Sequence, residues 1–423
     1  MKLDFNYGKQ QLSFQIPDEN IAATLMPRNA LSGLRNEDEV LRSLANPIGS
    51  PALCELVKPG QKIVIITSDI TRPLPSYMVL PPLLKELAEC GIPNSDITVI
   101  FALGCHRGHT AEEQRALVGD FVFDNYRCID SDPADCVHLG TTTLGTPVDI
   151  FKTAAEADIR IGVGNLDYHY FVGYSGGMKA IMPGVSTRAA IQSNHSRMTE
   201  PDAVAGQLDG NPVRGDIDEA AEICPLHFIV NVVLNAKKEV IASFSGNYKA
   251  AHRAGCEYLD SIYKFEIAEE APLVITSAGG YPKDINIYQA QKALDNARQA
   301  VRKGGIIIWV ARCQEGFGEG VFEQWMTTIP TIEETIARIE QQFELGGHKA
   351  AAIAMTLQKA TVYLVSDLDP DLVRRLHMHP FEDIEKALNQ ARVVLGEDTK
   401  AILMPYGGAT LPVAINKKQE EKL

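Results

Sequence analysis

The sequence feature that most constrains the fold is a repeated order of apolar strand, polar loop and helix. Three runs rich in apolar residues each lead directly into a polar loop: residues 63–67, 96–104 and 158–165. Uninterrupted apolar runs of this kind are typical of parallel strands buried on both faces. Strands that alternate with helices form a parallel α/β sheet with right-handed crossovers. Because ligands bind at the carboxyl ends of such strands, we expect the three polar loops to meet at one site.

The same rhythm restarts in the last third of the chain. Strand-like runs occupy residues 272–280, 305–313, 361–367 and 401–408, and helices are expected near 288–302, 331–345 and 382–395. A chain of 423 residues is too long for one ordinary core. The sequence therefore predicts an α/β protein with two domains, residues 1–270 and 271–423. Each domain is expected to hold a largely parallel, Rossmann-like sheet flanked by helices.

The two ends of the chain differ in character. Residues 1–20 alternate apolar and polar side chains, which predicts a hairpin at a sheet edge. The tail, residues 416–423, is polar and is expected to be solvated and frayed.

Charge and composition exclude several classes of function. The net charge of −14 argues against binding to nucleic acid and to anionic membrane surfaces. No apolar run approaches the roughly 20 residues that cross a bilayer, and the N-terminal segment shows no apolar export signal. The eight cysteines are scattered without a paired spacing, which predicts reduced thiols and a cytoplasmic protein.

The segment 164–195 concentrates reactive side chains in a glycine-rich context. It holds His169, His195 and Lys179, and Gly176-Gly177 stands just before the lysine. Backbone amides and an ammonium group could together bind an anion here, although the spacing is not that of a P-loop. A lysine in such a setting could also attach covalently to a carbonyl-like cofactor.

Two other strand-end loops carry candidate site residues. Residues 68–76, SDITRPLPS, contain Asp69 and Arg72. Asp69 could simply cap a turn, whereas the planar guanidinium of Arg72 suits a carboxylate or phosphate. Residues 104–110, GCHRGHT, contain His106 and His109; we favour His106 for chemistry because it lies nearer the strand end.

A fourth loop, in the second domain, enters a helix. Residues 279–292, GGYPKDINIYQAQK, place Tyr288, Gln289 and Lys292 directly after a strand that ends in Gly-Gly. Gln289 and Lys292 are three residues apart and share one helical face. From spacing alone, a solvated surface pair is slightly favoured over a binding role.

Five ordered motifs resemble the nickel-dependent lactate racemase family over nearly the whole chain. They are SDITRPLPS, GCHRGHT, YHYFVGYSGGMKAIMPG, IQSNH and GGYPKDINIYQAQK. The resemblance implies two domains with the site in the cleft between them. It also implies a nickel-pincer cofactor, a pyridinium mononucleotide with two sulfur-bearing carbonyl groups, which depends on cofactor-synthesis enzymes as partners.

The resemblance assigns a role to each candidate residue. Lys179 would hold the cofactor through a thioamide and His195 would bind nickel, while His106 and His169 would be the paired acid-base residues. The substrate carboxylate would be oriented by Arg72, Gln289 and Lys292. The remaining cofactor contacts would come from Asp69, Arg72, Gly176, Gly177 and Tyr288. The implied reaction is racemisation or epimerisation of a 2-hydroxy acid by reversible hydride transfer, for which two bases of opposite facing are needed.

Some positions depart from the family pattern and bear on the substrate. Lactate-acting members close the pocket with a tryptophan of the second domain, and neither Trp309 nor Trp325 aligns with it clearly. Gly108-His109 would add room and a polar ring beside His106. Both points suggest a hydroxy acid that is larger or more polar than lactate.

Two other classes of function compete with this interpretation. A zinc-type hydrolase could use His106, His109 and His169, although no HExxH pair is present. A non-catalytic protein could bind anionic sugars or hydroxy acids through Arg72 and Lys179. The sequence does not determine the oligomeric state.

Overall fold

The apolar runs of the sequence form the central strands of two separate sheets. The computed structural model describes residues 1–28, 33–235 and 237–415. The chain divides into two compact units. We call Ala30–Leu259 the central unit, and Met1–Asn29 together with Asp260–Leu423 the terminal unit. The predicted frayed tail lies outside the described residues.

The central unit is built on a six-stranded sheet in the order β13-β12-β9-β4-β5-β6. All neighbours are parallel except the edge pair β12–β13. The strands are β4 (Ile63–Ser68), β5 (Ile97–Ala102), β6 (Arg127–Asp130), β9 (Ile159–Leu166), β12 (Phe228–Leu234) and β13 (Val240–Gly246). Ser68 pairs with Ala102, so β4 and β5 end side by side and their loops leave the same edge.

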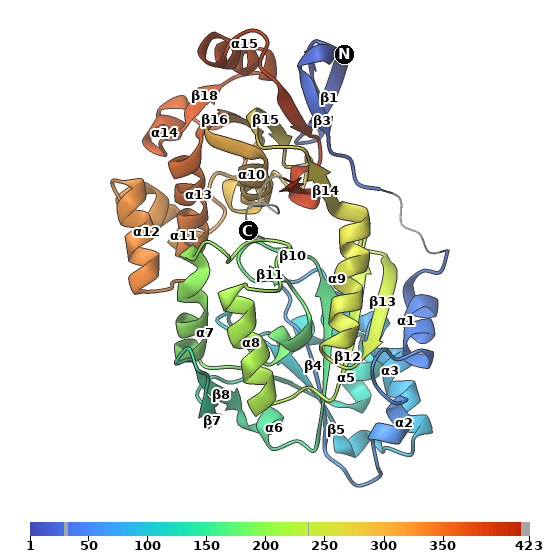
Figure 1. Cartoon of the computed structure of the whole chain (residues 1–423). Coiled ribbons are helices and arrows are strands. Elements are labelled where there is room, and N and C mark those ends of the chain that lie inside the picture. Colours follow the sequence, from blue (N-terminus) through green and yellow to red (C-terminus); the bar gives the residue numbers. More distant parts are fainter. Residues whose placement is uncertain (29–32, 236, 416–423) are drawn as a thin grey trace. The chain divides into compact units, whose positions relative to one another are not determined.

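Helices cover the sheet of the central unit (Figure 1). They are α1 (Asn36–Ala45), α2 (Leu53–Leu56), α3 (Ser76–Glu89), α4 (Ala111–Val118), α5 (Asp120–Asn125), α6 (Lys152–Ala155), α7 (Arg188–His195), α8 (Pro212–Ile223) and α9 (Ala250–Tyr263). Two antiparallel hairpins, β7 (Cys136–Thr141) with β8 (Pro147–Phe151) and β10 (Tyr168–His169) with β11 (Gly173–Tyr174), complete the unit. Thr110 and Glu113 form a capping box at the start of α4.

The terminal unit contains a second six-stranded sheet, in which all neighbours are parallel. Its order is β18 (His379–Phe381), β17 (Thr361–Val365), β16 (Val301–Val310), β15 (Ala271–Ser277), β19 (Ala401–Met404) and β3 (Ile21–Thr24). Two pairs of strands stand apart from it, the hairpin β1 (Lys2–Tyr7) with β2 (Gln10–Gln15) and the parallel pair β14 (Lys264–Ile267) with β20 (Leu411–Ala414).

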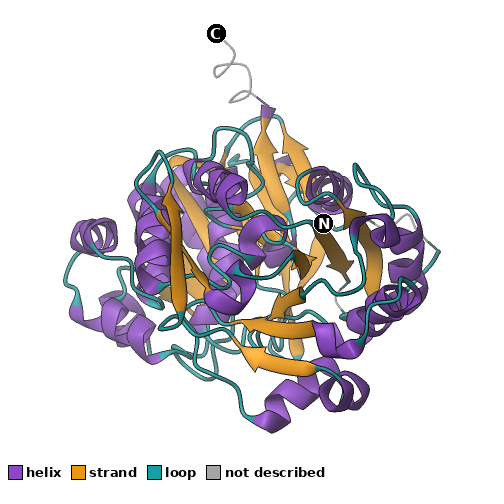
Figure 2. Cartoon of the chain, turned by 90° about the horizontal axis from the view of Figure 1, so that it is seen from below, coloured by secondary structure: helices purple, strands orange, loops and turns teal. Residues whose placement is uncertain are grey.

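Helices also flank the strands of the terminal unit, and Figure 2 shows strands and helices by colour. The helices are α10 (Ile287–Ala300), α11 (Gly320–Thr328), α12 (Ile332–Gln341), α13 (Gly347–Lys359), α14 (Pro370–Arg375) and α15 (Ile384–Leu395). The predicted α/β class with largely parallel sheets is therefore confirmed. None of the helices in the described part of the chain is long and apolar enough to cross a membrane.

The compact units differ from the predicted division of the chain at residue 270. Residues 1–29 belong to the terminal unit, because β3 is the last parallel strand of its sheet and pairs with β19. Phe5 and Phe14 of the first hairpin are buried in the same core as Leu273. An alternating pattern identifies a strand but not the sheet that the strand joins.

One prediction about the cysteines is wrong. Cys54 and Cys90 form a disulfide that links α2 to the C-terminal end of α3, with Cα atoms 5.0 Å apart. The two residues are separated by 36 positions in sequence, so no short cysteine motif predicts the disulfide. The six other cysteines are free thiols.

Candidate active site

A buried carboxylate on the loop after β4 orients a histidine on the loop after β5. Asp69 is 3% exposed, and its Oδ1 accepts hydrogen bonds from Thr71 N (3.0 Å) and Thr71 Oγ1 (2.7 Å). Its Oδ2 pairs with Nδ1 of His106. Burial opposes ionisation of this carboxyl, but the bonds from His106 and Thr71 outweigh it and lower the pKa of Asp69. The carboxylate therefore holds the Nδ1 proton, which leaves Nε2 of His106 to exchange a proton with a bound molecule.

His109 fills a structural role on the same loop. Its side chain is 1% exposed; Nδ1 donates to Asp130 Oδ1 (2.7 Å), and Nε2 accepts from the backbone N–H of Ile70 (3.1 Å). The ring thus ties together the loops that follow β4 and β5. The prediction that His109 adds a polar ring to the pocket is wrong, because both ring nitrogens are bonded within the protein. Gly108 lies close to the same carboxylate, since a Cβ there would lie 3.2 Å from Asp130 Oδ2.

The backbone just before Lys179 is approached closely by two other elements. Gly176 (φ 74°) and Gly177 (φ 59°) have left-handed conformations that favour glycine. The Gly177 N–H donates to Oδ1 of Asn231 on β12 (2.8 Å), and a Cβ at Gly177 would lie 2.8 Å from the ring of His252 on α9. The glycines thus permit tight packing, and the Gly177 amide is bonded to the protein rather than held open for an anion.

Lys179 is half-buried, and among the described residues no carboxylate pairs with its amine. It lies in the short 3-10 helix Gly177–Ala180. Across the residues that the structure describes, its Nζ has neither a hydrogen bond nor an ion pair. Desolvation, followed by the positive charges of Arg72 and Arg214, lowers the pKa of Lys179 well below its usual value. Because only the unprotonated amine is a nucleophile, the lowered pKa makes Lys179 more reactive than an exposed lysine.

His195 is set in one tautomer by the residue beside it. The ring is 7% exposed at the C-terminal end of α7. Asn194 donates from Nδ2 to Asp216 Oδ2 (2.7 Å) and to the carbonyl of Val213 (3.1 Å), so its Oδ1 faces Nδ1 of His195 at 2.8 Å. His195 accordingly carries its proton on Nδ1, and its Nε2 is the nitrogen with a lone pair. Metal-binding histidines are held in one tautomer in the same way.

His169 lies among aromatic side chains in the β10–β11 hairpin. Its ring stacks on Tyr170, with centroids 5.4 Å apart, and meets the ring of Phe171 at 4.5 Å. The backbone N–H of Val172 donates to its Nδ1 over 3.4 Å. Phe171 also contacts His195, with ring centroids 4.9 Å apart. One phenyl ring therefore lies against both the predicted base and the predicted nickel ligand.

The donor groups do not form a multi-ligand metal site. Among the described residues, no three His, Cys, Asp or Glu side chains gather so as to hold a metal ion. His106 and His109 are each paired with a carboxylate instead. Catalytic zinc sites need three protein ligands, so the arrangement does not support a zinc hydrolase. A site in which the protein supplies a single ligand needs no such cluster.

The candidate residues of the terminal unit lie at the start of α10. The side chain of Asn286 caps this helix by accepting from the backbone N–H of Gln289 (2.9 Å). Gln289 and Lys292 are both exposed. Lys349 contacts Tyr288 in two ways. Its Nζ lies 3.8 Å from the ring centroid and donates a hydrogen bond to the Tyr288 carbonyl. Binding roles for Tyr288, Gln289 and Lys292 stay predictions.

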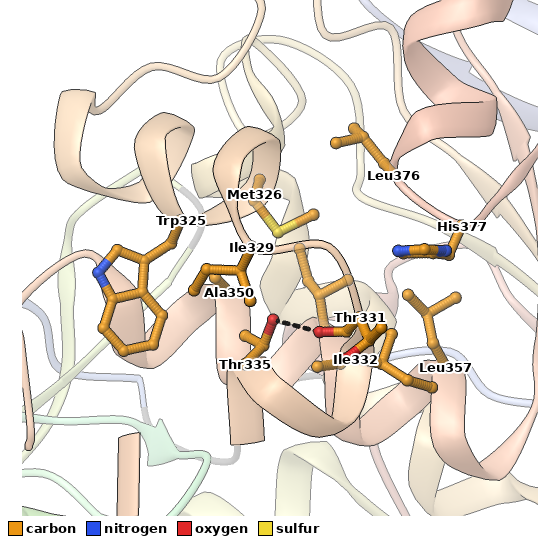
Figure 3. A pocket seen from close by; sticks show the side chains of 12 residues that line it. Trp325, Met326, Ile329, Thr331, Ile332, Thr335, Ala350, Leu357, Leu376 and His377 are labelled. Carbon is orange, nitrogen blue, oxygen red and sulfur yellow. Dashed lines mark hydrogen bonds between the residues drawn. The ribbon is translucent and has the colours of Figure 1, made fainter. Parts of the chain in front are cut away.

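Both tryptophans are buried within the terminal unit. Trp309 is fully buried in β16, and Trp325 is 1% exposed in α11. The indole Nε1 of Trp325 donates to Glu344 (2.7 Å). Trp325 lines a small pocket with Met326 and Ile329, shown in Figure 3. Its cavity volume of about 20 Å³ holds no more than a water molecule.

Sequence reasoning missed the polar residues that support the candidates. They are Asn194, Arg214, Asn231, His252 and Asp130. Asn194 was signalled by its place beside His195 in IQSNH, and Asp130 by its place at the end of a strand. The other three stand within helical or strand patterns that carry no motif of their own.

Comparison with known proteins places the whole chain beside one family. Residues 7–206 match the lactate racemase N-terminal domain, and residues 267–411 match the lactate racemase C-terminal domain. The lactate racemase of Thermoanaerobacterium thermosaccharolyticum is 34% identical over 417 residues, covering 96% of this chain and 97% of that protein. The lactate racemase of Lactiplantibacillus plantarum is 35% identical over 421 residues, covering 96% and 98%.

Solved structures agree as well. The lactate racemase apoprotein of T. thermosaccharolyticum aligns with a TM-score of 0.89 at 34% identity, covering 97% of this chain and 100% of that one. A protein from Thermotoga maritima shares the fold alone, with a TM-score of 0.64 at 19% identity and coverage of 92% and 100%. These likenesses define an isomerase of the racemase class. The chain belongs to the lactate racemase family.

Proposed function

We propose that the protein interconverts the stereoisomers of a 2-hydroxy acid, using a nickel-pincer mononucleotide attached to Lys179. The observation that carries the proposal is the state of this lysine. Its amine is desolvated, faces two arginine charges and has no partner among the described residues. A lysine kept only for stability would be expected to pair with a carboxylate or to reach solvent.

The residues fit such a cofactor. The amine of Lys179, with its lowered pKa, suits an amide-type bond to a carbonyl-like carbon. His195 offers Nε2 to nickel, because Asn194 fixes the proton on Nδ1. When bound, the cofactor supplies an acceptor for the α-hydrogen of the substrate as hydride.

The two proposed bases act on the hydroxyl proton. Nε2 of His106 takes or returns this proton for one enantiomer, and the Asp69 carboxylate stabilises the imidazolium that forms. His169 does the same for the other enantiomer. A positioned base contributes roughly 10²–10⁴-fold to the rate, so both histidines are needed for turnover in both directions.

Lactate is the first candidate substrate, because both full-length relatives are lactate racemases. Arg72 is exposed on the loop after β4 and offers a planar fork for the carboxylate, with Gln289 and Lys292 as further proposed contacts. A larger or more polar acid remains within the proposal, because neither tryptophan is exposed to a surface where it could narrow a pocket. A screen of 2-hydroxy acids for loss of optical rotation, with cofactor-loaded protein, distinguishes the two. Equal turnover of lactate and larger acids would argue against a preference for size.

Intact mass and nickel content test the attachment directly. Protein produced together with the cofactor-synthesis enzymes, its proposed partners, should carry one adduct and one nickel. The adduct should vanish in Lys179→Ala and persist in Lys85→Ala, a control on the exposed face of α3. Racemase activity in protein that holds zinc and no adduct would overturn the proposal. A cytoplasmic location stays a prediction.

A further inference from the structure

The backbone of residues 172–175, which leads to Lys179, is held by buried side chains that the proposed reaction does not use. The guanidinium of Arg214, on α8, donates from Nη2 to the carbonyl of Tyr174 and from Nε to the carbonyl of Val172 (3.4 Å). His252, on α9, donates from Nε2 to the carbonyl of Ser175 (2.9 Å). Side chains from two helices thus bind three of the four carbonyls of this segment.

The charge of Arg214 is poorly neutralised. The side chain is 1% exposed, and the carboxylate of Asp218 stands 3.9 Å from its Nη1. Asp218 is already engaged by Arg253, whose Nη2 lies 2.6 Å from Oδ2. Burial lowers the pKa of Arg214 to about 10, so the group remains cationic at neutral pH.

The titratable groups that act on the Lys179 amine are cations or neutral. Arg72 acts from the loop after β4 and Arg214 from α8. His252 approaches from α9, but burial and then Arg214 lower its pKa well below the usual value, so it is neutral. No carboxylate within the described residues offsets the two arginines at this amine.

We propose that Arg214 is a positioning residue for cofactor attachment. Its hydrogen bonds fix the segment that presents the Lys179 amine, and its buried positive charge, together with that of Arg72, opposes protonation of this amine in the apo-protein. The amine lone pair is then more readily available for attack. The inference rests on the proposed attachment at Lys179, but it can be measured without the cofactor.

The test is competitive acetylation of the full-length apo-protein with acetic anhydride over a pH series, followed by peptide mass spectrometry. Lys179 should acetylate at lower pH than the exposed Lys85, since only the unprotonated amine reacts. Arg214→Gln should move the Lys179 curve to higher pH, which lowers the reactivity of the amine by roughly tenfold for each pKa unit at pH values below its pKa. Arg214→Lys, which keeps a charge, should restore most of the shift.

Arg160→Gln is the matched control. Arg160 also binds backbone carbonyls of the central unit, those of Pro225 and Ala157 at 2.8 Å each, but it does not act on Lys179. The inference is overturned if Lys179 titrates with Lys85 in the wild type, or if Arg160→Gln moves the curve as far as Arg214→Gln does.

A second variant covers loss of folding. If Arg214→Gln fails to fold by circular dichroism, Arg72→Gln removes the other charge from an exposed position, and an unmoved Lys179 curve then overturns the role of charge. The two proposals fail separately. A shifted Lys179 curve without an adduct in the cofactor-loaded protein would remove the proposed function alone.

Discussion

Replacing Asp69 by Asn would reverse the hydrogen bond that orients His106. Both donors of Thr71 bond to one carboxylate oxygen, and the other oxygen faces Nδ1 of His106. An asparagine must keep its oxygen toward Thr71, so its NH₂ group would face the imidazole. Nδ1 would then have to accept, which moves the ring proton to Nε2 and blocks that nitrogen as a base.

The size of the effect follows from the role of the group. Loss of a positioned base costs roughly 10²–10⁴-fold in kcat/KM, which is about 2.7–5.4 kcal/mol. The effect on folding should be smaller, about 1–3 kcal/mol, because one charge-assisted hydrogen bond is lost. The pKa of Asp69 is lower folded than unfolded, so its stabilisation is present above about pH 4 and disappears as pH falls through the lowered value. Asp69→Asn should lack this acid-dependent part.

The assay is racemisation of lactate by the cofactor-loaded protein, followed by optical rotation, with urea unfolding measured in parallel. Asp130→Asn is the control, because it alters the same kind of carboxylate–histidine pair at His109, which is not a proposed base. It should lower stability as much as Asp69→Asn does but retain far more activity. A rate loss in Asp69→Asn no larger than that of the control would refute the reasoning.

Three further predictions concern the rest of the central unit. Asn194→Leu should weaken retention of nickel at His195 by about 10–100-fold, measured as nickel lost from loaded protein on dialysis against a chelator. Cys54→Ser should lower the free energy of unfolding by about 3–4 kcal/mol, because Cys54 and Cys90 close a loop of 36 residues; added reductant should then cause no further loss. Gly177→Ala should destabilise by about 2–4 kcal/mol in urea titrations, because its φ of 59° is strained for alanine and the new methyl would meet the imidazole on α9.

The strands and their polar loops could be predicted because buried parallel strands are recognisable as uninterrupted apolar runs. The register between β4 and β5 could not be predicted from the sequence. This register brings Asp69 next to His106. The sequence favours His106 over His109 only through its place nearer the strand end. The structure separates them through partners on distant segments, since Ile70 and Asp130 occupy both nitrogens of His109.

The side chains that hold the segment before Lys179 could not be predicted for a similar reason. Arg214 and His252 are isolated polar residues in amphipathic helices, where a solvated surface position is the ordinary expectation. Their importance comes from burial against the carbonyls of residues 172–175, which depends on how α8 and α9 pack. The pattern within one helix does not contain that information.

The parallel pairing of β3 with β19 sets an order on the synthesis of this chain. Ile21 leaves the ribosome long before its partner Ala401, because hundreds of residues separate them in the sequence. The central unit has all of its own strands long before that point and can fold during translation. Strand β3 must wait with this edge unpaired until β19 has been made. Shortening the chain before residue 401 would therefore leave a nascent N-terminal segment without a template, and exposed to aggregation.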